Sequence, residues 1–357
     1  MENNYLKNQK VIYKLLVHLK ALFCKNLALE YHKITPQHAG GTYATPYSQF
    51  IRQIRITQTV IAIVLFVGGV IFSFPKLHQT IAATSVNFSG VAYTDEGTSP
   101  LDGTAVNKTV YLSVNGVYTG TDEITDNTGA WAINSVSVDS GDIITVYLDN
   151  ETEEATTVFV SNETTQSNIN LYQNFVIVRA DTGSISNANL DTGDDTDDDI
   201  KYSVDISDNV TFDSGFHLHI WAGDTYAPAG TVATQGGGDI HITSSATFNT
   251  GGNAVTVNGS WDNDGAYVHG NGLVTFNASS GTHTIDADSP SDDDFYNVVI
   301  NDGGGTAHWD LTSQPMQIDG NLTITDGEID LNNYDTYVEG DLSKTGGALV
   351  LDQVSSQ

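Results

Sequence analysis

The pattern of hydrophobic and polar positions divides the chain into two unlike parts. Residues 59–74 form a run of sixteen uncharged, mostly apolar positions. From Val86 onward, short stretches alternate apolar with polar residues and are separated by Gly, Asn, Asp and Thr. This alternation, interrupted by turn residues, predicts β-strands. We therefore expect an all-β protein preceded by one helix, with early strands at residues 87–93, 109–114, 130–136 and 143–148.

The apolar run predicts a signal or transmembrane helix over residues 59–76. Sixteen helical residues rise about 24 Å, which is short for a hydrocarbon core of about 30 Å. Arg52 and Arg55 precede the run, so the positive-inside rule places residues 1–58 in the cytoplasm and the rest outside. Small residues at 82–85 offer a cleavage site. Cleaved signal and retained anchor both stay open, and the chain contacts the membrane only if it is uncleaved.

The net charge of −31 is unevenly distributed between these parts. Residues 1–85 include nine basic and two acidic side chains, or +7. Residues 86–357 include four basic and 42 acidic side chains, or −38. Such an acidic body excludes nucleic-acid binding by phosphate neutralisation. The only cysteine, Cys24, lies in the basic segment, so the exported part has no disulfides.

Internal repeats occupy the region after residue 176. The phrase from Val257 to Gly265 recurs from Val338 to Gly346, and this displacement fits about four solenoid turns of roughly twenty residues. Gly and Asn suit the corners of such turns. A parallel β-helix is therefore predicted, with interior ladders formed by Phe212, Phe248, Val257, Phe276, Ile300, Ile324 and Val338.

Two resemblances refine this organisation. The motifs Gly90–Gly97, Pro100–Gly103 and Thr125–Trp131 resemble the carboxypeptidase-regulatory-like (transthyretin-like) β-sandwich, which implies a spacer over residues 86–175 with Trp131 in its core. The motifs Gly259–Asn263, Gly272–Phe276, Phe295–Ile300 and Tyr337–Gly340 resemble the right-handed parallel β-helix repeats of bacterial adhesin-like surface proteins. That resemblance implies a β-helix over residues 176–357.

Two groups of side chains are candidates for metal binding. The acidic run ending at Asp199 offers clustered carboxylates for Ca²⁺, at Asp191, Asp194, Asp195 and Asp197. A solvated linker is the alternative, because like charges repel one another. His217 and His219 alternate on one strand face, but no third ligand is apparent, which favours an outward-facing polar pair.

The predicted function is structural. We expect an exported cell-surface protein without enzymatic activity, which projects a β-helix stalk toward the cell envelope, matrix, glycans or other cells. No cofactor other than calcium is expected. The alternative is a polysaccharide-binding or polysaccharide-degrading enzyme that uses an exposed Asp pair, either Asp262 with Asp264 or two of Asp292, Asp293, Asp294 and Asp310.

Overall fold

The computed structural model describes residues 84–287 and 295–351, all of which belong to the compact unit that begins at Thr80. The predicted basic segment (1–58) and signal or transmembrane helix (59–76) lie outside the described residues. Among the residues that are described, no helix is long and apolar enough to span a membrane. The fold is all-β, as predicted, with one short described helix, α3 (Asn187–Gly193).

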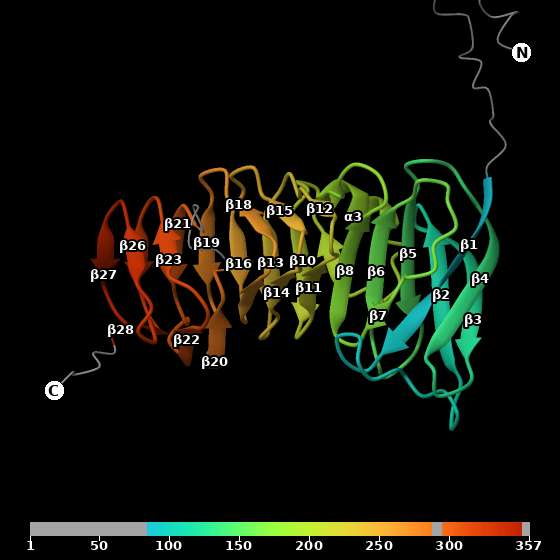
Figure 1. Ribbon diagram of the computed structural model, residues 1–357, viewed down its shortest axis with the longest axis horizontal. Coiled ribbons are helices and arrows are strands. Elements are labelled where there is room, and N and C mark those ends of the chain that lie inside the picture. Colours follow the sequence, from blue (N-terminus) through green and yellow to red (C-terminus); the bar gives the residue numbers. More distant parts are fainter. Residues whose placement is uncertain (1–83, 288–294, 352–357) are drawn as a thin grey trace, which may run out of the picture. The chain divides into compact units, whose positions relative to one another are not determined.

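One twelve-stranded sheet runs the whole length of this unit (Figure 1). From β8 onward, neighbouring strands of this sheet are parallel, whereas β3, β2, β5 and β6 pair antiparallel. In spatial order its strands are β3 (Val117–Ile124), β2 (Lys108–Val114), β5 (Ile143–Leu148), β6 (Thr156–Val160), β8 (Phe175–Ala180), β11 (His217–Ile220), β14 (Ile240–Ile242), β17 (Trp261–Asn263), β20 (Ser280–Ile285), β22 (Thr306–Leu311), β25 (Glu328–Asp330) and β28 (Ala348–Val350).

A second sheet of eight strands accompanies the first. Its order is β9 (Tyr202–Val204), β10 (Val210–Ser214), β13 (Val232–Gln235), β16 (Val255–Val257), β19 (Leu273–Phe276), β21 (Asn297–Ile300), β24 (Leu322–Ile324) and β27 (Leu342–Lys344). Two small sheets complete the turns: β12 (Thr225–Tyr226), β15 (Thr247–Asn249) and β18 (Ala266–Val268), and then β23 (Met316–Ile318) with β26 (Thr336–Val338). Together they form a β-solenoid of about nine turns, consistent with the predicted parallel β-helix.

The solenoid interior is a continuous apolar core. Val257, Phe276, Ile300 and Ile324 are paired from strand to strand along the eight-stranded sheet. All four are buried, as are Phe212 and Phe248. Val338, the last predicted interior residue, is partly buried and packs against this core.

The repeat register inferred from the sequence was wrong. Val257 lies in β16, whereas Val338 lies in β26, which belongs to a different sheet. Following the strand partners of Val257 through four turns leads to Lys344 instead. Turns differ in length, because the step from Val232 to its partner Val255 is longer than the step from Val255 to its partner Val274. A constant offset between repeated sequence phrases therefore does not match the strand pairing over several turns.

The first strands form a second core next to the solenoid. A three-stranded sheet is formed by β4 (Ala130–Val138), β1 (Thr84–Tyr93) and β7 (Leu171–Tyr172). It packs on the end of the twelve-stranded sheet that contains β2, β5 and β6. Trp131 is buried there, as expected, and the four predicted early strands are present. Alternate residues of β5 face the two cores, since Ile144 joins this one and Ile143 joins the solenoid core. The twelve-stranded sheet thus continues across residue 175 without a break.

Candidate functional site

Three histidines lie side by side on the outer face of the twelve-stranded sheet. In β11 and β14 the apolar residues Leu218 and Ile240 point into the solenoid core, so the alternating His residues point outward. The strands are parallel and in register, with His219 directly paired with His241. His217 lies on the same face of β11, and its ring is 6.0 Å from that of His241.

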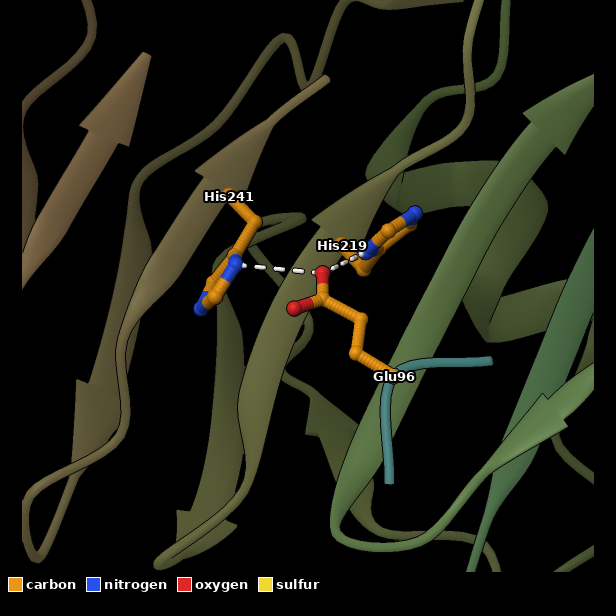
Figure 2. A group of neighbouring side chains, drawn as sticks. All are labelled: Glu96, His219 and His241. Atoms are coloured by element: carbon orange, nitrogen blue, oxygen red, sulfur yellow. Dashed lines mark hydrogen bonds and ion pairs between the residues drawn. The ribbon is translucent and has the colours of Figure 1, made fainter. Parts of the chain in front are cut away.

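Glu96 reaches these histidines from the segment that follows β1. Its Oε1 atom is 2.9 Å from Nδ1 of His219 and 3.2 Å from Nδ1 of His241 (Figure 2). The turn that carries Glu96 is held by Asp95, whose Oδ1 accepts hydrogen bonds from the backbone N–H groups of Thr98 and Ser99. One carboxylate oxygen therefore bridges two imidazoles from adjacent solenoid turns.

Asp239 brings a second carboxylate to the same group of histidines. Asp239 Oδ2 is 3.0 Å from Nδ1 of His217 and 3.8 Å from Nε2 of His241. The other Asp239 oxygen accepts a hydrogen bond from the backbone N–H of Ser260 on the next turn. We call these five residues the histidine cluster: Glu96, His217, His219, Asp239 and His241.

Within the cluster, the charged forms of Glu96, Asp239 and His241 are stabilised by their neighbours. Burial opposes ionisation of Glu96, but hydrogen bonds from His219 and His241 outweigh it and hold the pKa of Glu96 well below its usual range. The pKa of Asp239 is lowered in the same way, against burial, by His217 and His241. Burial also disfavours charge on His241, yet hydrogen bonds to Asp239 and Glu96 raise its pKa to about 9.

Aromatic rings flank the histidine cluster. Tyr172 meets His219 edge-on with centroids 5.4 Å apart, and Phe175 lies within 5.3 Å of the ring of His241. Trp221 is 5.9 Å from His219. His219 is only 5% exposed, whereas the side chain of Glu96 is 39% exposed. The cluster is therefore buried at His219 and open to solvent at Glu96.

The expected outward-facing pair, His217 and His219, is thus part of a larger group. Both side chains point away from the solenoid core, but the segment after β1 covers His219. Sequence reasoning missed His241, Asp239 and Glu96. A signal for His241 was available, because Ile240-His-Ile242 repeats the pattern of Leu218-His-Ile220. Glu96 carries no such signal, since it lies far from His219 in the sequence, at a separation of 123 residues.

In the acidic run that was predicted to bind calcium, most candidate carboxylates accept hydrogen bonds from nearby backbone N–H groups. Asp194, Asp195 and Asp197 each accept a hydrogen bond from the backbone N–H two residues later. Asp191 lies within α3. Of the four candidates, only Asp197 lies in a group of carboxylates close enough to share an ion; its companions, Asp149 and Asp199, were not among the candidates. The calcium prediction stays untested.

Of the carboxylates predicted for the enzymatic alternative, the structure describes Asp262, Asp264 and Asp310. Asp262 lies beside the histidine cluster, with Oδ2 3.6 Å from Nδ1 of His241. Asp310 lies in β22, several strands further along the twelve-stranded sheet, where it is 3.9 Å from His308. Asp292, Asp293 and Asp294 lie outside the described residues.

Comparisons of the chain with protein-family models, with curated proteins and with solved structures found no match. The functional argument therefore depends on the solenoid and on the histidine cluster.

Proposed function

We propose that this protein is an exported, non-enzymatic stalk that projects from the cell surface and offers a repetitive face to matrix, glycans or other cells. The observation that carries this proposal is the unbroken twelve-stranded sheet. Eleven strand spacings of about 4.8 Å give a sheet about 53 Å long. Because every strand is hydrogen-bonded to the next, the described strands form one continuous ladder from β3 to β28.

The chemistry of the exterior supports the same proposal. Large apolar side chains lie in the solenoid core, and the part of the chain after residue 85 carries a net charge of −38. A strong single-sign charge keeps a repetitive β surface soluble and opposes edge-to-edge association. These are properties that a surface-projecting solenoid needs.

Export is tested with the full chain carrying a C-terminal epitope tag in a bacterial host. We expect protease added to intact cells to remove the tag, and a variant lacking residues 59–74 to retain it. Cells carrying the full chain are then compared with cells carrying that variant for adhesion to immobilised polysaccharide, matrix and other cells. A tag that is protected in the intact chain contradicts export. Release of reducing sugar from a polysaccharide panel by the purified chain contradicts the non-enzymatic role.

A further inference from the structure

We propose that Glu96, His219 and His241 bind one divalent transition-metal ion of the Zn²⁺ class, which fastens the segment after β1 to the solenoid. This inference goes beyond the stalk proposal and does not depend on it. It rests on the donor atoms, on their spacing, on the groups behind them and on the rigidity of the strands that carry them.

The donor set selects the class of metal. Two imidazole nitrogens and one carboxylate oxygen suit Zn²⁺ and its first-row neighbours, whereas Ca²⁺ and Mg²⁺ prefer oxygen atoms alone. Three protein ligands also leave a coordination position for water, as at open zinc sites. The exposed side of Glu96 gives solvent access to that position.

The spacing fits one small ion. Metal–ligand bonds of about 2.0–2.1 Å in a tetrahedral site place ligand atoms about 3.3 Å apart. Glu96 Oε1 is 2.9 Å and 3.2 Å from the two Nδ1 atoms, and all three ligand atoms lie within 4.8 Å of one another (Figure 2). The two O–N distances therefore lie within about 0.4 Å of the tetrahedral spacing, and binding displaces the protons on the two Nδ1 atoms.

The residues that surround the three ligands are of the kind that commonly orients ligands at metal sites. A ligating histidine usually donates its second ring N–H to a carboxylate, which fixes its tautomer. Asp239 lies on that side of His241, with Oδ2 3.8 Å from Nε2, within ion-pair distance; its Oδ1 accepts from the Ser260 N–H, and its own backbone N–H donates to Nδ1 of His217. The buried rings of Tyr172 and Phe175 lie against His219 and His241.

Titration of the purified full-length chain, freed of metal with a chelator, tests the proposal. Calorimetry with ZnCl₂ is compared for the wild type, Glu96→Gln and His241→Gln, with His308→Gln as the matched control on the same sheet. We expect His241→Gln to lose one equivalent of bound Zn²⁺, Glu96→Gln to bind it at least ten-fold more weakly, and His308→Gln to match the wild type. Cys24 and the histidines that precede Thr84 are common to all four proteins and cancel in the comparison.

Equal stoichiometry and affinity in the wild type and Glu96→Gln would overturn the proposal. Glu96 is in an exposed turn, so this variant decides the question even if His241→Gln fails to fold, which circular dichroism reports. A titration with CaCl₂ checks the class of ion, and equal binding of Ca²⁺ by the cluster also overturns it.

Discussion

His219 and His241 are directly paired on the adjacent strands β11 and β14, with ring centroids 6.3 Å apart and planes inclined by 25°. One turn of the solenoid brings these two residues together. The backbone ladder fixes their separation, so both rings are positioned before any ion arrives. A preorganised pair loses little conformational freedom on binding, which favours affinity.

Replacing Asp239 with Asn tests whether the second carboxylate supports the site. The amide keeps the shape but loses the charge that orients His241, and such changes behind a ligand typically weaken metal affinity about 10-fold to 100-fold. We expect Zn²⁺ to bind with unchanged stoichiometry and at least about ten-fold lower affinity in calorimetry. Asp213→Asn, on an exposed residue of β10, is the control. Unchanged affinity in Asp239→Asn would assign Asp239 a purely structural role.

Thr234 is a polar residue in the buried interior of the eight-stranded sheet. Its hydroxyl donates to the carbonyl oxygen of Gly238 at 2.6 Å and accepts from the N–H of Asn258 at 2.9 Å. Thr234→Val keeps the volume but leaves both backbone groups unpaired, so we expect a loss of about 2 kcal/mol in the free energy of unfolding. Urea unfolding measures it, against Thr256→Val, whose side chain is only partly buried. Equal stability of the two variants would refute this role for the Thr234 hydroxyl.

The type of fold could be predicted from the sequence because it depends on local patterns. Alternation placed Val257, Phe276, Ile300 and Ile324 inside, and each is buried. The register could not be predicted, because it depends on the length of each turn and these lengths vary. The repeated phrase at Val257 and Val338 therefore fell on different sheets.

The histidine cluster was predictable only where its residues lie on one strand. His217 and His219 share β11 and were recognised from their alternation. His241 comes from the next turn, which only the correct register would align with His219. Glu96 depends on tertiary packing of the segment after β1, for which no periodic pattern exists.

The corner before β22 requires glycine at position 305. A Cβ atom on Gly305 would lie 1.7 Å from the carbonyl oxygen of Ser279, and only a backbone shift would relieve this contact. Gly303, in the same corner, has open space around it but a φ of +65°. We expect Gly305→Ala to lower unfolding stability by about 3 kcal/mol through overpacking. Gly303→Ala should lower it by only about 1 kcal/mol through backbone strain. Urea titration that ranks the two in reverse would contradict the close approach.

Lys201 supplies the positive charge nearest to the acidic run. Its Nζ atom is 2.8 Å from Oε1 of Glu154 and 3.9 Å from Oδ1 of Asp199, and its side chain is 11% exposed. An ammonium group in this position competes with any added cation for the same carboxylates. For the wild type, freed of metal beforehand, we therefore expect millimolar CaCl₂ to leave the melting temperature unchanged.

Lys201→Met removes that competition. Leaving partly buried carboxylates without their cation should lower the unfolding free energy by about 2 kcal/mol, less than for a fully buried pair because Glu154 is partly exposed. Ca²⁺ should then bind to Asp149, Asp197 and Asp199 and recover part of the loss, since a ligand that binds only the folded state raises its stability. Lys344→Met, at an exposed position of β27, should show neither effect. A rise in the wild-type melting temperature with Ca²⁺ would instead show that the acidic run binds calcium with Lys201 in place.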